Sequence, residues 1–271
     1  MNLELVIPYL PVIIAAMLVS PALAIQGAFI TQQGQANWML AISQLCITGH
    51  LLGKVFVPQE YFLLEFLVVI LFYWIGHYFS KRHQLDDIGL LSIFISFMAI
   101  NYQLISFIPI LESHLTSTLY GDIATLSNQD AYFLSVLAFT YLVLNLKFLS
   151  IRLRSLIDLI HYQVETSNLK TVLLNTFIHA FLVFSLLKLG FLFVLAFLLL
   201  PSQFLRNSSK SLNSFLLGGV IISILSSSLG LLGSLNWTRL STMPTQISIL
   251  LLLGLTIKAY SWVSKKIPKR L

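Results

Sequence analysis

Residues 198–207, LLLPSQFLRN, mark the point where a nearly uninterrupted apolar segment reaches a proline and turns over a short polar patch. This patch contains Arg206 and Lys210, and the chain becomes apolar again near Phe215. A basic turn between two apolar segments is typical of membrane-spanning helices joined on the cytoplasmic side. The stretch therefore predicts a membrane protein, with a cytoplasmic turn at this point.

The composition of the whole chain supports this prediction. Of its 271 residues, 57% are hydrophobic and only 10% are charged, whereas a soluble domain carries roughly 25% charged residues. So few charges cannot cover a water-facing surface. We therefore expect residues 1–271 to form a single transmembrane domain with little soluble mass.

Apolar segments long enough to cross a bilayer recur along the chain, since one span needs roughly 20 apolar residues. They fall near residues 6–29, 59–80, 88–110, 131–150, 213–233 and 246–264. Segment 38–54 is weaker because it contains polar residues, and segment 171–201 is long enough for two short spans, interrupted at Lys188 and Gly190. Backbone groups in a bilayer must be satisfied within their own segment. The sequence thus predicts an all-α bundle of eight or nine transmembrane helices.

The charges between these segments predict the orientation of the chain, because cytoplasmic loops are enriched in lysine and arginine. The basic clusters are residues 81–83, 152–170, 206–210 and 265–270, whereas loop 111–130 contains acidic residues but no lysine or arginine. Nine helices would place all of these basic clusters in the cytoplasm together with the C-terminus, leaving Arg239 as the one exception. Eight helices, with 38–54 only partly inserted, would move the N-terminus to the cytoplasmic side.

The motifs of common enzyme classes are absent from the sequence. It has no His-Glu-x-x-His motif and no Gly-rich phosphate loop ending in lysine. The only adjacent carboxylates, Asp86 and Asp87, lie at a membrane edge. We therefore expect no enzyme activity and no bound cofactor. The net charge of +6 is spread over segment ends, which also argues against nucleic-acid binding.

The weak segment 38–54 carries the polar side chains best suited to contact a substrate inside the membrane. On a helix, Gln44 and Thr48 share one face, while Cys46 and His50 share another. A thiolate and an imidazole at this spacing are suitable ligands for zinc or a similar metal. The alternative is that Cys46 is a small packing residue and that His50 bonds to a backbone carbonyl.

Three other polar residues lie in apolar segments. Asn101 and Gln103 either line a cavity or form hydrogen bonds between helices. Glu65 is costly to bury unless it is paired or hydrated, so we expect it at the membrane interface.

Four stretches of the sequence form a wider pattern. They are Gln26-Gly27-Ala28-Phe29-Ile30 with Ala41-Ile42-Ser43-Gln44 and Gly49; Leu119-Tyr120-Gly121-Asp122-Ile123 with Ser127 and Asp130; Gly190 through Leu200-Pro201; and Met243-Pro244-Thr245 with Ile247. In this order they resemble the blocks of the permease subunits of bacterial ABC importers for zinc, manganese or iron, the ABC-3 family. The resemblance extends over nearly the whole chain.

The resemblance implies a permease of the bacterial inner membrane with the fold of type II-like ABC importers. Such a permease pairs with itself or a paralogue, receives its ion from an extracytoplasmic binding protein, and is driven by cytoplasmic ATPase subunits that use the ATP. Residues 201–212 would form the coupling turn that docks into the ATPase, since a short turn tied to two helices can transmit a rigid-body push. Its contacts would be Pro201, Gln203, Phe204 and Arg206. Without the resemblance, this turn is an ordinary cytoplasmic loop.

The chain departs from the family at the expected metal contacts. The family has an aspartate followed four residues later by a histidine, and these positions hold Leu40 and Gln44 here. Leucine cannot bind a metal, and a glutamine amide is a weak neutral ligand. Either the path uses other groups, such as Cys46 and His50, or the substrate is a metal chelate or another small solute. A non-transporting scaffold protein is the alternative from a different functional class.

Overall fold

The computed structural model describes residues 7–57, 62–83, 86–162, 169–206, 208–209, 211–237 and 240–266. The described residues form helices joined by short turns, without a β-strand. The α-helices are α2 (Leu10–Gln32), α3 (Ala36–Phe56), α4 (Phe62–His83), α5 (Asp87–Phe107), α6 (Glu112–Tyr120), α7 (Asn128–Lys147), α8 (Leu149–Tyr162), α9 (Leu169–Leu189), α10 (Phe191–Leu205), α11 (Leu212–Asn236) and α12 (Thr242–Lys266). Three short 3-10 helices are η1 (Ile7–Tyr9), η2 (Pro109–Leu111) and η3 (Ile123–Thr125).

The all-α prediction is confirmed, and each predicted apolar segment forms a helix. Six helices in the described ranges are long and apolar enough to cross a membrane: α2, α3, α5, α7, α11 and α12. The apolar parts of α4, α9 and α10 are shorter. Segment 38–54 lies within α3, a continuous helix of 21 residues that is long and apolar enough to cross a membrane. The choice between eight and nine transmembrane helices stays a prediction.

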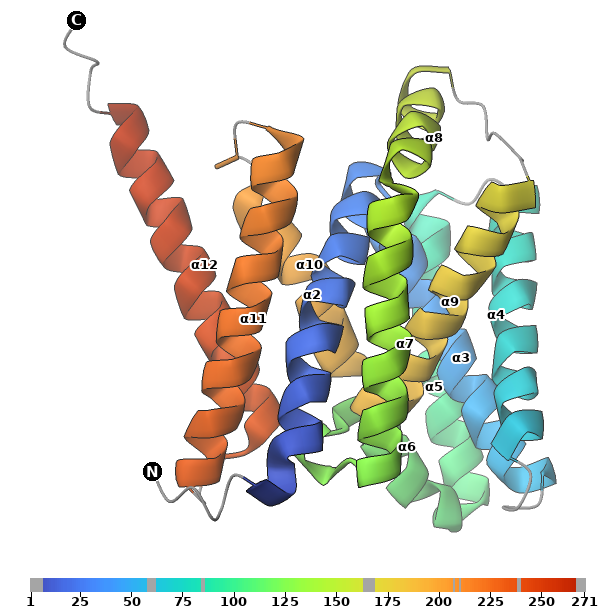
Figure 1. Ribbon diagram of the computed structural model, residues 1–271. Coiled ribbons are helices and arrows are strands. Elements are labelled where there is room, and N and C mark those ends of the chain that lie inside the picture. The colour runs from blue at the N-terminus through green and yellow to red at the C-terminus, as the bar shows by residue number, and fades with distance from the viewer. Residues whose placement is uncertain are drawn as a thin grey trace, which may run out of the picture.

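The helices alternate in direction along one axis (Figure 1). The C-terminal ends of α4, α10 and α12 lie together with α8 at one end, called the α8 end. The opposite end carries α6 and is called the α6 end. The predicted basic clusters therefore belong to segments at the α8 end, and the acidic loop lies at the α6 end. Lys210, Arg239 and residues 267–270 lie outside the described residues.

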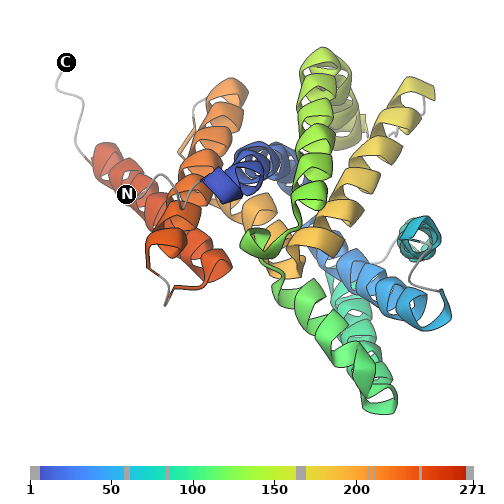
Figure 2. The ribbon, with the colours of Figure 1, turned by 60° about the horizontal axis from the view of Figure 1, so that its bottom comes forward.

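Helix α2 is the centre of the bundle and packs against α7, α10 and α11, as the view toward the α6 end shows (Figure 2). In the apolar 18-residue stretch of α2, 72% of the residues are buried, whereas in the corresponding stretch of α5 only 11% are buried. Small residues allow helices to approach closely in membranes. At Gly27 a Cβ atom would collide with the backbone carbonyl of Leu198 in α10, so only glycine permits this contact.

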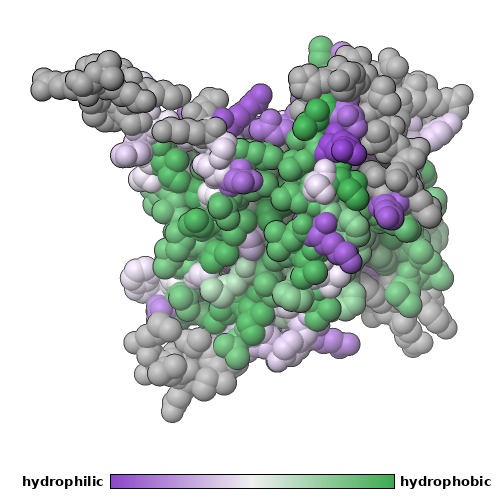
Figure 3. Space-filling model, turned by 45° about the horizontal axis from the view of Figure 1, so that its top comes forward, coloured by the Kyte–Doolittle hydropathy of each residue, from purple (hydrophilic) through white to green (hydrophobic). Residues whose placement is uncertain are grey.

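The outer surface of the bundle matches a lipid environment. Large apolar side chains are exposed along the outward faces, for example Leu63 (76%) in α4 and Ile95 (64%) in α5. In the space-filling view, apolar residues cover the middle of the molecule, and polar residues gather toward its ends (Figure 3). Exposing these apolar side chains to water would be unfavourable, so we expect them to face the acyl chains of a bilayer.

The interruption between α9 and α10 occurs at Gly190, as predicted. Its φ of 85° lies in the left-handed region that favours glycine, and its backbone contacts that of Gly121. Two residues earlier, the Lys188 ammonium pairs with the carboxylate of Asp130 at 2.8 Å. Helix α10 has only 15 residues, or about 22 Å of length, which is less than the hydrocarbon thickness of about 30 Å.

Candidate functional site

A polar cluster joins α3 to α5 in the interior of the bundle. The Thr48 hydroxyl donates to Asn101 Oδ1 at 2.7 Å, and the Asn101 amide donates to Gln44 Oε1 at 3.2 Å. All three side chains are buried, with exposures of 1–3%. Gln103 of the same helix is exposed. Of the two predicted residues of this helix, Asn101 therefore forms the hydrogen bonds between helices. Gln44, which stands where the resemblance places a histidine, accepts a hydrogen bond from the neutral Asn101 amide.

Replacing Asn101 by alanine is expected to destabilise the protein by about 2 kcal/mol, because the buried Gln44 side chain would lose its partner and Thr48 would keep only the Gln44 backbone carbonyl. The matched control is Gln103→Ala, which changes an exposed polar residue of the same helix and should leave stability nearly unchanged. Thermal denaturation in detergent measures both. Equal melting temperatures for the two variants would contradict the role assigned to Asn101.

The other two predicted substrate contacts face α4 rather than α5. Cys46 is 2% exposed, and the Nδ1 atom of His50 lies 2.6 Å from Glu65 Oε1. The predicted separation of two helix faces is thus correct, and Gln44 does not share a site with Cys46 and His50. Among the described residues, no group of three or more His, Cys, Asp or Glu side chains is close enough to hold a metal ion.

Glu65 is the centre of an ion cluster near the α6 end. It is 6% exposed, and its second carboxylate oxygen lies 2.8 Å from Lys54 Nζ. The partner of His50 is therefore a carboxylate and not the backbone carbonyl considered above. His114 of α6 packs its ring edge-on against His50, with centroids 6.3 Å apart. Partial burial lowers the pKa of His114, and the nearby ammonium of Lys54 lowers it further.

A second histidine-containing cluster lies between α3, α4 and α9. The rings of His77 and His179 are 6.0 Å apart, and Tyr73 packs against His179 at 4.8 Å. Trp38 covers both histidines edge-on or tilted, with centroid distances of 5.7 Å to His77 and 6.2 Å to His179. This arrangement is an aromatic core that joins three helices.

Arg152 connects α8 to the centre of the bundle. Its guanidinium donates to Gln26 Oε1 of α2 at 2.7 Å and to the side chains of Asn145 and Tyr141 of α7. It also lies 3.8 Å from the centre of the Phe29 ring, a cation–π contact. Gln26 and Phe29 belong to the first of the four stretches that resemble the permease family. Part of that stretch therefore binds α8 through Arg152.

The turn that follows α10 begins after Leu205 and not at Pro201, the first residue of the predicted coupling turn. Helix α10 continues through Pro201 to Leu205, because a proline removes only one backbone hydrogen bond and is tolerated in membrane helices. Pro201 is buried, whereas Gln203 and Arg206 are exposed. The ring of Phe204 lies against Gly254 of α12, where a Cβ atom would collide with it. Of the four predicted contacts, only Gln203 and Arg206 face outward.

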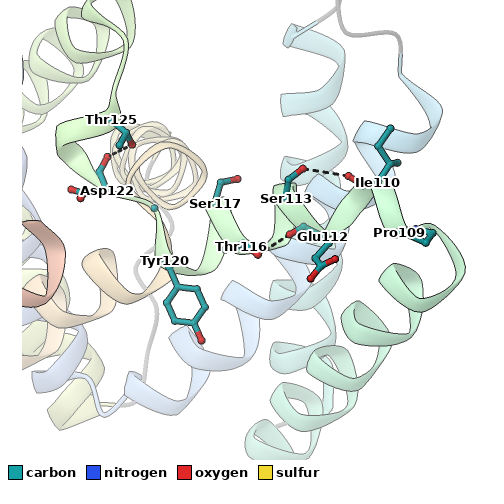
Figure 4. A pocket seen from close by; sticks show the side chains of 10 residues that line it. Pro109, Ile110, Glu112, Ser113, Thr116, Ser117, Tyr120, Asp122 and Thr125 are labelled. Atoms are coloured by element: carbon teal, nitrogen blue, oxygen red, sulfur yellow. Dashed lines mark hydrogen bonds between the residues drawn. The ribbon is translucent and has the colours of Figure 1, made fainter. Parts of the chain in front are cut away.

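An open hollow of about 770 Å³ lies on α6 and the turns beside it. Its lining includes two carboxylates, Glu112 and Asp122, and the hydroxyl groups of Ser113, Thr116 and Tyr120 (Figure 4). Asp122 also caps η3 by accepting from Ala124 N at 3.0 Å. The hollow is therefore a largely apolar surface that carries two acidic side chains at the α6 end.

Comparisons with known proteins support the resemblance described above. The sequence model of the ABC 3 transport family matches residues 8–261. Among solved structures, the chain is similar to one titled PsaBC from Streptococcus pneumoniae in complex with Fab, with a TM-score of 0.77 and 18% identity over 97% of this chain and 100% of that chain. At this identity the likeness concerns the fold. No curated protein matches the sequence.

Proposed function

The chain belongs to the ABC 3 transport family, and we propose on this basis that it moves a divalent transition-metal ion, zinc or manganese, across the bacterial inner membrane. It is a multi-pass membrane protein and the permease of an ABC importer, not the subunit that hydrolyses ATP. The observation that carries the proposal is the family match over residues 8–261, together with the helical fold. The proposal assigns ATP hydrolysis to a partner subunit.

The α8 end is proposed to face the cytoplasm and to bind the ATPase, because the predicted basic clusters belong to segments there. Two elements at this end can transmit a movement of the ATPase to the bundle. One is the end of α10 and the turn that follows it, where Gln203 and Arg206 are exposed, and the other is α8. Helix α8 stands beyond the end of α7 (Figure 1). Arg152 ties it to α2 and α7, so a displacement of α8 would reach the centre of the bundle.

The α6 end is proposed to receive the extracytoplasmic binding protein. Its hollow offers carboxylates and hydroxyls to a soluble partner, with Glu112 and Asp122 in its lining. Acidic side chains at the mouth of a path also raise the local concentration of a cation. A homodimer or a pair with a paralogous permease would enclose the path.

A second candidate substrate is a metal chelate or another small solute. The observation that favours it is the neutral cluster of Gln44, Thr48 and Asn101, because Gln44 stands where the family resemblance places a metal-binding histidine. A neutral amide cluster suits a hydrogen-bonding solute better than a bare cation. For a free ion, Cys46 and His50 are the proposed contacts instead.

The experiment that tests the proposal is purification of the complex from native membranes, identification of the co-purifying chains and elemental analysis. An ATPase with stoichiometric zinc or manganese supports the proposal. An ATPase without metal supports the second candidate. Absence of an ATPase under conditions that preserve such complexes would contradict the importer assignment and favour a scaffold protein.

Arg206→Glu is expected to reduce substrate uptake in reconstituted vesicles at least about 10-fold, because it reverses an exposed charge on the proposed ATPase-binding turn. Gln203→Glu should act in the same direction with a smaller effect. Both variants should remain folded, since these side chains are exposed. Phe204→Ala is the contrast, because it removes packing against α12 and should lower the melting temperature. Normal uptake by Arg206→Glu would exclude the turn from coupling.

A further inference from the structure

Two histidine rings face each other near the α6 end, one from the interior of the bundle and one from its surface. The ring planes of His50 and His114 are nearly perpendicular, at 83°, with centroids 6.3 Å apart. His50 is buried, and His114 is half-exposed. A small solute can therefore reach the His114 ring, which lies beside His50, from the α6 side.

Glu65 fixes which nitrogen of His50 is available. Its carboxylate lies 2.6 Å from His50 Nδ1, and Glu65 is itself buried at 6% exposure. The carboxylate therefore occupies the Nδ1 side of the ring, and Nε2 is the nitrogen that faces away from it. Metal-binding histidines generally have a carboxylate beside the ring nitrogen that does not bind the ion.

We propose that His50 and His114 together bind a divalent transition-metal ion of the zinc class, with water in the remaining coordination positions. Zinc–nitrogen bonds of about 2.1 Å would place two imidazole centroids on a tetrahedral ion about 5 Å apart. The observed separation is 6.3 Å. Binding therefore draws the two rings about 1 Å closer, through rotation of the side chains and a small movement of α6 toward α3.

Lys54 sets the strength of this site. Its ammonium lies 2.8 Å from the second oxygen of Glu65, so it neutralises the carboxylate and repels an incoming cation. Two imidazoles without a net negative charge make a weak site, which suits a position that an ion must leave again. Removing the lysine charge should tighten binding, because the second Glu65 oxygen then becomes free.

The identity of the ion rests on the proposed function, but its binding is measurable without transport. We would titrate the purified full-length protein in lipid nanodiscs with Zn²⁺ by calorimetry, and with Co²⁺ by visible absorption. One saturable site is expected for the unaltered protein. His114→Gln and Glu65→Gln should each weaken Zn²⁺ binding about 10-fold, whereas Lys54→Met should tighten it about 10-fold. His179→Gln is the control, because it removes a histidine outside the site.

Wild-type-like Zn²⁺ binding by His114→Gln would overturn the inference, as would unchanged or weaker binding by Lys54→Met. Loss of folding cannot explain either result, because each variant is tested only if it elutes as a single species in size-exclusion chromatography. The two proposals also fail separately. A chain that binds Zn²⁺ through His114 but does not transport it would refute the proposed function alone, and a transporting chain indifferent to His114→Gln would refute this site alone.

Discussion

Gly27→Ala is expected to lower stability by about 3 kcal/mol, although it adds only one methyl group. That methyl group would occupy the position of the Leu198 backbone carbonyl, and a backbone atom cannot move aside as the end of a flexible side chain can. Helices α2 and α10 would have to separate, which would open the centre of the bundle. Gly27→Leu should prevent recovery of folded protein altogether.

The matched control for this variant is Gly219→Ala. Gly219 is also buried within a helix of the bundle, but a Cβ atom there would meet only side-chain carbons of Ala24 and Leu205 at 3.9 Å. Alanine is favoured over glycine inside a helix by about 0.5–1 kcal/mol, so this variant should be as stable as the parent or slightly more stable. Thermal unfolding in detergent distinguishes the two, and equal melting temperatures would show that α2 and α10 are not in close contact.

Arg152→Ala is expected to destabilise the protein by about 3 kcal/mol, because it removes charge-assisted hydrogen bonds and leaves Gln26 and Asn145 short of a partner. Its larger effect should be on transport. Without the guanidinium, α8 loses its hydrogen bond to Gln26 of α2. Uptake by reconstituted vesicles should fall much more than the amount of folded protein does.

Two variants separate this role from a general effect of charge. Arg154→Ala removes an exposed arginine from the same helix and should retain uptake. Arg152→Lys keeps the charge but not the planar fork that reaches two helices at once, so it should retain only part of the uptake. Equal uptake by Arg152→Ala and Arg154→Ala would show that α8 does not act through this contact.

Much of the fold is predictable from the sequence, because apolar length and the need to satisfy the backbone determine where membrane helices form. The break at Gly190 and the two polar faces of α3 also follow from local sequence. The end of α10 does not. Pro201 lies inside the helix because its neighbours are apolar enough to keep the backbone helical, so the turn begins only after Leu205.

The site itself depends on contacts between residues far apart in the sequence. Gln26 and Arg152 are 126 positions apart, and nothing near either residue indicates the other. The same holds for His50 and His114, which come from an interior helix and a short surface helix. Local periodicity predicts which residues share a face, but the packing of whole helices decides what each face meets.

The central position of α2 has a consequence for how the protein is made. Its partners α7, α10 and α11 all come later in the sequence, so a ribosome delivers α2 to the membrane well before its neighbours exist. The helix is predominantly apolar and contains no charged residue, so it is stable in lipid before its partner helices are inserted. Its glycine and small residues then receive the later helices, so a segment that is inserted before its partners completes its contacts only when they arrive.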